Sequence, residues 1–414
     1  MSFCAINDKN ENQLMVIWDL GRKCTYSCSY CPPHRKNNWS PVASLDELIK
    51  TADSLDRYAN IYNKYRQTPF RTACSFTGGE PTVNPAFFDF LIYLQQNYPH
   101  WKRTLTTNGF YTERKLRLVM SNTQFTTLSY HCESTDEQKK RVRDNIKIMH
   151  DEKYGFKVNV MFHENEQYFR ECVELCEWFD EIGVQYTPRI IGDEGTVKRG
   201  IQDKTVHTYT EEQIAWFKNY WNLKKEKKKE IKIPPPSNTL NLETVQPEKK
   251  IVGQSIGRPC CGGRNLEIYE NNTWEPTKFV TNNNFQGWSC MVNWYFLYIH
   301  QEINKIWHHQ TCQVNLEGKV SPISTVEGFD QYCDRLEATI DETGSIPFIR
   351  CPKTYCGCGL CAPKAKTDEM AELLFRSHTT NITPKFIEQQ TETYSGSLKD
   401  LVYEHDRKNG NETI

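Results

Sequence analysis

The sequence predicts an α/β fold, with a parallel sheet in roughly the first 220 residues and a smaller cysteine-rich part after it. Strand-like and helix-like stretches alternate along the first region, and parallel strands need a crossover, usually a helix, to return the chain. A charged helix end followed by Pro234–Pro236 separates the two parts, because such a stretch is typical of a stiff linker.

Each expected element has a local signal. Apolar or β-rich runs predict strands at 14–18, 73–76, 104–109, 125–131, 156–163 and 184–191. Helical spacing and capping signals predict helices at 45–62, 86–97, 135–151, 166–182 and 211–227. Two helix starts are marked: Ser44 and Glu47 form a capping-box pattern, and Asn84 precedes Pro85 as an N-cap.

Composition limits the class of protein. The chain has 51 Lys and Arg against 52 Asp and Glu, so its charge gives no case for binding nucleic acid or an acidic membrane. No apolar run approaches a membrane span, and no signal-peptide segment opens the sequence. We therefore expect the 17 cysteines to serve metal in a reducing, cytoplasmic compartment.

The first motif is CxxxCxxC, formed by Cys24, Cys28 and Cys31 directly after the first expected strand. Thiolates are the usual protein ligands of iron–sulfur clusters, and three on one loop would leave the fourth iron of a four-iron cluster open. A zinc loop is the alternative, although zinc sites favour paired CxxC units and a closed set of four ligands.

The second motif is Gly78-Gly79-Glu80, at the end of the second expected strand. Two glycines there let the backbone approach a ligand closely, and Glu80 can receive an ammonium group. In this order, with aromatic Tyr30 before Cys31, the two motifs resemble the radical S-adenosylmethionine (radical SAM) superfamily.

This resemblance implies a partial (β/α)6 barrel of the TIM type. It implies that Cys24, Cys28 and Cys31 bind a [4Fe–4S] cluster whose open iron is chelated by the amino and carboxylate groups of SAM. Reductive cleavage of SAM would then release a 5′-deoxyadenosyl radical that abstracts hydrogen from a substrate. Tyr30 would lie beside the adenine, and the Gly78–Glu80 segment would hold the methionine end.

Sites in such barrels lie at the carboxyl ends of the strands, and this rule selects six further residues: Asn108, Ser129, His131, Met161, His163 and Arg189. Asn108, Ser129 and Arg189 are expected to bind SAM, with Arg189 pairing with its carboxylate. The other three are expected to face the substrate. The alternative is that these polar residues cap strand ends, or that Arg189 forms a surface ion pair.

The C-terminal part carries a second cysteine pattern. A cysteine, a hairpin at about 295–309, a second cysteine and a late CxxC are similar to the SPASM or twitch auxiliary-cluster domains of radical SAM enzymes. On that resemblance, a second [4Fe–4S] cluster would be bound by Cys290, Cys312, Cys358 and Cys361, with Cys351 and Cys356 as spare ligands. The spacing of the last cysteines departs from the full SPASM pattern, and zinc is the alternative metal.

The expected domains are a barrel at 1–222, a linker at 223–258, a cysteine-rich domain at 259–365, and a helix with a polar tail at 366–414. The first functional hypothesis is oxidation or cross-linking of a peptide or protein side chain, with an electron donor such as flavodoxin or ferredoxin. The second is dehydrogenation or rearrangement of a small polar metabolite, such as a sugar, aminocyclitol or nucleotide. The third is a non-catalytic zinc or iron–sulfur protein.

Overall fold

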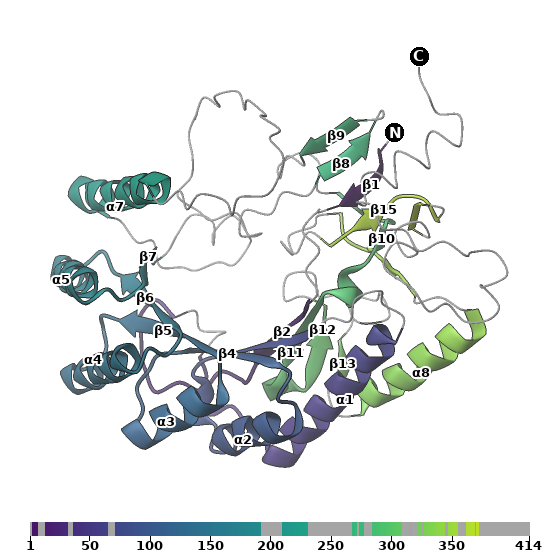
Figure 1. Cartoon of the computed structure of the whole chain (residues 1–414), viewed down its shortest axis with the longest axis horizontal. Helices are drawn as coiled ribbons and strands as arrows, with labels where there is room; N and C mark the ends of the chain where they lie inside the picture. The colour runs from purple at the N-terminus through teal and green to yellow at the C-terminus, as the bar shows by residue number, and fades with distance from the viewer. Residues whose placement is uncertain are drawn as a thin grey trace, which may run out of the picture.

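The computed structural model describes residues 2–6, 13–31, 36–64, 71–191, 209–230, 267–270, 273–276, 284–308, 314, 316, 322–324, 327–343, 347–354, 362–368 and 370–371. Its main feature is a nine-stranded sheet with the order β13-β12-β11-β2-β3-β4-β5-β6-β7. The helices α1 to α5 cover the outer side of this sheet (Figure 1). Among the described residues, none of the helices combines the length and the apolar character that crossing a membrane requires.

Six neighbouring strands of this sheet are parallel, as predicted: β2 (Gln13–Asp19), β3 (Arg71–Thr77), β4 (Lys102–Thr107), β5 (Phe125–His131), β6 (Phe156–Phe162) and β7 (Tyr186–Ile190). The helices on this part of the chain are α1 (Leu45–Asn63), α2 (Phe87–Asn97), α3 (Glu113–Asn122), α4 (Asp136–Asp151), α5 (Glu166–Ile182) and α7 (Glu211–Glu230). The predicted α/β class with a partial (β/α)6 barrel is confirmed.

Alternating burial along the strands separates the helix side of the sheet from its inner side. In β5 the residues Leu128 and Tyr130 are buried in one hydrophobic core with Val142 and Ile146 of α4. The intervening residues are only partly buried and face the interior of the barrel. The inner side is therefore where the strand-end residues selected from the sequence can meet.

Two details of the helices differ from the prediction. Helix α3 was not predicted, although Thr112 caps it and Leu116 and Val119 bury one face at helical spacing. Helix α2 begins at Phe87 with Ala86 as its N-cap. Asn84 instead accepts a hydrogen bond from the Ala86 N–H at 3.0 Å, so it shapes the turn before the helix. The predicted capping box of Ser44 and Glu47 is present on α1.

The C-terminal hairpin is formed by β11 (Phe296–His300) and β12 (Lys305–Trp307), with Asn304 in the left-handed conformation at its turn. It does not lie in a separate domain, because β11 pairs in parallel with β2, from Phe296 opposite Met15 to His300 opposite Asp19. Without this pairing β2 would leave its backbone groups unpaired at the sheet edge.

Helix α8 (Gly328–Thr343) joins the outer layer beside α1. Ser54 of α1 donates a hydrogen bond to Asp330, and Arg57 pairs with Asp334 at 2.7 Å. The nine-stranded sheet therefore contains strands from both of the expected regions, the barrel at 1–222 and the domain at 259–365. The linker after residue 230 and most of the tail lie outside the described residues.

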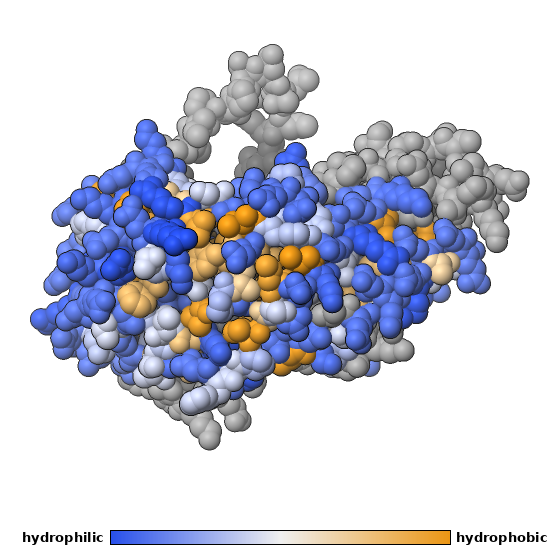
Figure 2. All heavy atoms as spheres, turned by 90° about the horizontal axis from the view of Figure 1, so that it is seen from below, coloured by the Kyte–Doolittle hydropathy of each residue, from blue (hydrophilic) through white to orange (hydrophobic). Residues whose placement is uncertain are grey.

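A second, six-stranded sheet brings the N-terminal and C-terminal segments together, with the order β14-β10-β15-β1-β8-β9. Its strands are β14 (Ile349–Arg350), β10 (Ser289–Cys290), β15 (Lys364–Ala365), β1 (Ser2–Ile6), β8 (Glu267–Glu270) and β9 (Thr273–Pro276). Figure 1 places this sheet above the open side of the barrel, close to the N-terminus. Figure 2 shows the molecule from below, where patches of hydrophobic residues lie among hydrophilic ones.

Candidate active site at the carboxyl edge of the sheet

The cysteine loop leaves β2 and runs along the segment that follows β3. The Leu20 N–H donates to the Thr77 carbonyl at 2.9 Å, which continues the pairing of the two strands. The Gly79 N–H then donates to the Gly21 carbonyl at 2.6 Å, and the Glu80 N–H donates to the Lys23 carbonyl at 2.7 Å. These backbone contacts fix the start of the cysteine loop against the second motif.

The two glycines of that motif are required by the neighbouring backbone. A Cβ atom on Gly78 would lie 2.6 Å from the Gly21 carbonyl oxygen, and the φ of Gly78 is +141°. A Cβ atom on Gly79 would lie 2.4 Å from the Lys23 carbonyl oxygen. Both glycines thus approach the backbone at the start of the cysteine loop closely, and the predicted approach to a ligand stays a prediction.

Glu80 is buried beneath this junction and joins it to the end of β4. Its carboxylate accepts hydrogen bonds from Thr82 N–H at 3.1 Å, Thr82 Oγ1 at 2.7 Å, Thr107 Oγ1 at 2.8 Å and Asn108 N–H at 2.7 Å. Burial raises the pKa of Glu80, and these hydrogen bonds oppose that effect. The carboxylate therefore organises the site from inside the chain.

Asn108 connects β4 to the cysteine loop. Its Nδ2 donates to Thr25 Oγ1 at 2.9 Å and lies 4.0 Å from Cys24 Sγ. The side chain is 4% exposed, so this contact occurs in a nearly dry environment. The strand-end rule thus selected a residue that contacts the loop carrying the three cysteines.

The three cysteines of the loop are half-buried. Burial is the main cause that raises the pKa of the Cys24 thiol, and it raises the pKa of Cys28 to about 12. The neighbouring thiols of the loop raise both pKa values further. A metal that binds such thiols displaces their protons. Within the described residues, no three His, Cys, Asp or Glu side chains are grouped so that they could hold a single metal ion. A four-iron cluster instead distributes its thiolates over several irons, and three thiols on one loop fit that requirement.

His131, at the end of β5, closes over the middle of the cysteine loop. Its Nδ1 lies 2.5 Å from the Tyr30 hydroxyl and 3.5 Å from Cys28 Sγ. The rings of Tyr30 and His131 are stacked, with centroids 6.0 Å apart. Burial lowers the pKa of His131 to about 4, which keeps the imidazole neutral near pH 7.

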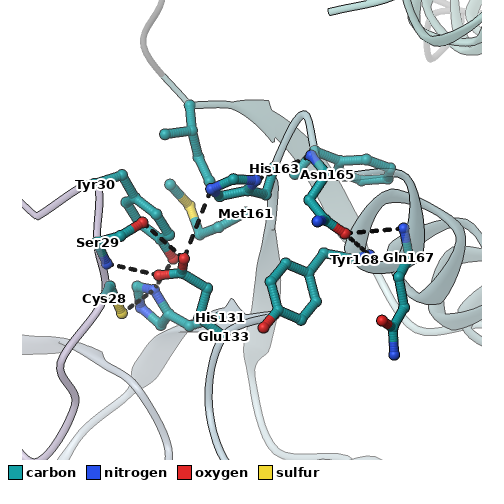
Figure 3. Close-up of polar contacts among 12 residues, drawn as sticks. Cys28, Ser29, Tyr30, His131, Glu133, Met161, His163, Asn165, Gln167 and Tyr168 are labelled. Carbon is teal, nitrogen blue, oxygen red and sulfur yellow. Dashed lines mark hydrogen bonds and ion pairs between the residues drawn. The ribbon is translucent and has the colours of Figure 1, made fainter. Parts of the chain in front are cut away.

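A second set of polar contacts, made by Glu133 with Ser29 and His163, lies beside the contact of His131 with Tyr30 (Figure 3). Glu133 accepts hydrogen bonds from the Ser29 N–H at 2.6 Å and the Ser29 hydroxyl at 2.7 Å. His163 Nε2 lies 3.6 Å from the same carboxylate. Because His163 Nδ1 accepts a hydrogen bond from the Asn165 N–H at 3.0 Å, the neutral ring carries its proton on Nε2, facing Glu133.

The other selected residues line the inner side of β5, β6 and β7. Met161 pairs in register with His131 on one side and with Arg189 on the other. Arg189 Nε donates to Asn159 Oδ1 at 3.3 Å, and Asn159 is also the register partner of Ser129. The structure therefore brings Ser129, Met161 and Arg189 onto adjacent strands. It also gives Arg189 a partner inside the barrel.

Sequence reasoning missed residues that hold the cysteine loop, chiefly Glu133, Arg22 and Glu302. Arg22 Nε donates to both carboxylate oxygens of Glu302, at 2.7 and 2.9 Å. Glu133 stands two residues beyond the end of β5, so the strand-end rule could have included it. Glu302 is 280 residues from Arg22, and no local pattern announces this pair.

The predicted C-terminal metal ligands are only partly described. Cys290 is buried on β10, and Cys351 follows β14 with its N–H donating to the Trp288 carbonyl at 2.9 Å. Cys290 is the register partner of Ile349, and Cys351 comes two residues after Ile349, just beyond the end of β14. Cys312, Cys356, Cys358 and Cys361 lie outside the described residues.

The structure places a loop with three cysteines at the carboxyl edge of a partial barrel. Residues 18–176 match the family model of the Radical SAM superfamily. This match supports the radical SAM superfamily for the barrel, and with it S-adenosylmethionine, a [4Fe–4S] cluster and an enzymatic role.

Individual relatives are more distant. A GTP 3′,8-cyclase of Haemophilus ducreyi is 26% identical over 124 residues, covering 28% of this chain and 32% of the relative. The chain thus spans less than a third of that relative's length in the match. Among solved structures, native anSMEcpe with bound AdoMet has a TM-score of 0.43 at 14% identity, covering 78% of this chain and 80% of that one. Streptococcus suis SuiB has a TM-score of 0.37 at 13% identity, covering 51% of this chain and 47% of that one.

Proposed function

We propose that this chain is a radical SAM enzyme that reductively cleaves S-adenosylmethionine and abstracts hydrogen from a substrate. The observation that carries the proposal is the junction of the cysteine loop with the Gly78–Glu80 segment, made by backbone hydrogen bonds at the carboxyl edge of the sheet. A cluster held by Cys24, Cys28 and Cys31 would supply the electron for reductive cleavage of the C5′–S bond of SAM.

The residues of the chain would hold and shield this chemistry. Cys24, Cys28 and Cys31 would bind the cluster as thiolates. The Gly78–Glu80 segment, with Tyr30, Asn108, Ser129 and Arg189, would bind SAM from neighbouring strand ends. His131, Met161 and His163 would face the substrate. The partial burial of this inner side supports a site from which much of the water is excluded.

The proposed reaction can be tested without knowing the substrate. The reconstituted protein, incubated anaerobically with SAM and a strong reductant, should form 5′-deoxyadenosine. Cys28→Ala should abolish this product. Cys176→Ala is the matched control, because that thiol is buried in the helix layer on α5. Absence of 5′-deoxyadenosine from the wild type would reject the enzyme and favour a non-catalytic metal protein.

For the substrate, we propose a peptide or protein side chain that is oxidised or cross-linked, with the C-terminal cysteines forming an auxiliary cluster of SPASM or twitch type. Cys290 on β10 and Cys351 just after β14, the strand that pairs with β10, support this arrangement. Such a cluster would accept the electron of the substrate radical, and flavodoxin or ferredoxin would supply the first electron. Two four-iron clusters would give about eight irons per chain, with about four left in the Cys24/Cys28/Cys31→Ala variant. Zinc in the second site would leave only about four irons in the wild type.

A small polar metabolite is the second candidate substrate, and one observation favours it. The match with a GTP 3′,8-cyclase points to a nucleotide. Chromatography of reaction mixtures that contain GTP would decide this candidate, since a GTP substrate must be consumed together with SAM. Unchanged GTP, in a reaction that still forms 5′-deoxyadenosine, would reject this nucleotide.

A further inference from the structure

The start of the cysteine loop is tied to the C-terminal hairpin through Arg22 and Glu302. The Glu302 side chain is 1% exposed, and it receives Arg22 Nε on both of its oxygens. Arg22 Nη2 contacts the same carboxylate, which makes this a fork-like pair. Glu302 belongs to η4 (Gln301–Ile303), the short helical turn between β11 and β12. Arg22 lies two residues before Cys24, so this pair joins the hairpin to the start of the loop.

Two more contacts make the same connection. Trp18 Nε1 donates to Gln301 Oε1 at 3.0 Å in a buried position. The Tyr298 hydroxyl donates to Asp19 Oδ2 at 2.8 Å, while Asp19 Oδ1 accepts from the Gly21 N–H at 3.0 Å. The end of β2 and the start of the loop are therefore held by Tyr298, Gln301 and Glu302 of the hairpin, over a sequence separation of about 280 residues.

The far part of the loop is held by a different carboxylate. Glu133 receives the backbone N–H and the hydroxyl of Ser29, which lies between Cys28 and Cys31. Glu133 is 17% exposed and is approached by His163, which directly follows β6. A carboxylate with two donors from one residue fixes both the position and the orientation of the backbone there.

We propose that Glu302 and Glu133 are positioning residues that hold the Cys24–Cys31 loop from its two ends in the shape that the cluster requires. The two carboxylates act on the loop and make no contact with the cysteine sulfur atoms in the hydrogen bonds above. The C-terminal hairpin is then part of the cluster site and is not only a support for a second metal centre. This inference rests on the proposed role of the three cysteines as cluster ligands.

The test measures how firmly the loop keeps its iron. Glu302→Gln and Glu133→Gln keep the size of each side chain and remove its charge. Partners that orient metal ligands typically change metal affinity about 10- to 100-fold when they are mutated. Each variant, after anaerobic reconstitution, should therefore lose iron to a chelator at least about tenfold faster than the wild type. The Cys24/Cys28/Cys31→Ala variant measures the iron held elsewhere, which is subtracted.

Glu337→Gln is the matched control. Glu337 also lies in the C-terminal part and pairs with an arginine of the first half, Arg57, but on the outer helices α8 and α1. The midpoint potential of the cluster and its electron paramagnetic resonance spectrum provide readouts that a general loss of stability would not move. If Glu302→Gln does not fold, Arg22→Lys keeps the charge and removes the planar fork of the same pair.

The outcomes separate the two proposals. If the wild type holds no iron that depends on Cys24, Cys28 and Cys31, the proposed function fails. If the wild type holds this iron, but Glu302→Gln and Glu133→Gln release it as slowly as Glu337→Gln and with an unchanged potential, the positioning role fails. Faster release with a shifted potential in the two variants alone supports it.

Discussion

Replacing Gly79 by alanine tests whether the two motifs depend on direct contact between their backbones. The added Cβ would meet the Lys23 carbonyl oxygen at 2.4 Å and the Arg22 carbonyl oxygen at 2.8 Å. Both obstacles are backbone atoms, so no side chain can turn away to make room. Gly79 does not have a positive φ, and backbone strain at the residue itself is therefore not part of the effect.

The expected cost comes from separating the two segments. Moving them apart stretches the hydrogen bonds from Gly79 N–H to Gly21 and from Glu80 N–H to Lys23, and each is worth about 1 kcal/mol. Crowding that the chain cannot relieve costs about 1–3 kcal/mol. Since movement lowers the crowding as it weakens the hydrogen bonds, we expect the free energy of unfolding to fall by about 2–4 kcal/mol.

Urea unfolding and iron content of the reconstituted protein measure this effect. Gly183→Ala is the control, because Gly183 ends α5 with φ of +77° and has no atom within 4 Å of the added Cβ. It should lose only about 1–2 kcal/mol from the left-handed backbone and keep its iron. Gly79→Ala should lose both stability and iron. A Gly79→Ala protein with the stability and iron content of the wild type would refute the reasoning.

Three further predictions concern stability. Burial lowers the pKa of His308 to about 4, from about 6.5 in the unfolded chain. Between these two pH values the unfolded state therefore binds more protons than the folded state. The stability that is present above pH 6.5 is lost as the pH falls through this range. At about pH 4.5 the wild type should therefore have lost about 2–3 kcal/mol more than His308→Gln in urea unfolding, and equal losses would contradict the assignment. Glu80→Gln places an amide group among four hydrogen-bond donors and should lower the free energy of unfolding by about 1–3 kcal/mol. Glu47→Gln is its control and should be nearly neutral, because glutamine also completes a capping box. Arg57→Ala removes exposed ion pairs with Asp334 and Glu337 and should cost less than about 1 kcal/mol in the same assay; a larger loss would mean that α8 depends on these charges.

The parts of the fold that sequence predicts well are those with local causes. The capping box at Ser44 and the alternating burial of β5 follow from neighbouring residues, and both are observed. The hairpin around Asn304 was predicted for the same reason, but its place in the main sheet was not. Four consecutive buried residues, Phe296–Ile299, are typical of a strand covered on both faces, and this signal favours an inner strand over an isolated hairpin.

The candidate site also contains residues that local patterns predict and residues that they do not. The cysteine loop, Glu80 and Asn108 were selected from motifs and strand ends, and the structure brings them within contact of one another. Their binding roles remain proposals. Glu302 was not selected, because its contact with Arg22 depends on β11 pairing with β2. Long-range ion pairs of this kind depend on tertiary structure, so local spacing does not reveal them.

The contact between the loops also gives a physical reason why the two motifs occur together. The carbonyl groups of Gly21 and Lys23 accept the N–H groups of Gly79 and Glu80, and the glycines leave room for this pairing. Glu80 then turns inward and fixes Asn108, whose amide returns to Thr25 of the cysteine loop. The ring of contacts is closed, so a change in one motif must alter the other. A glycine in the second motif is therefore expected to affect iron binding, although its own atoms bind no iron.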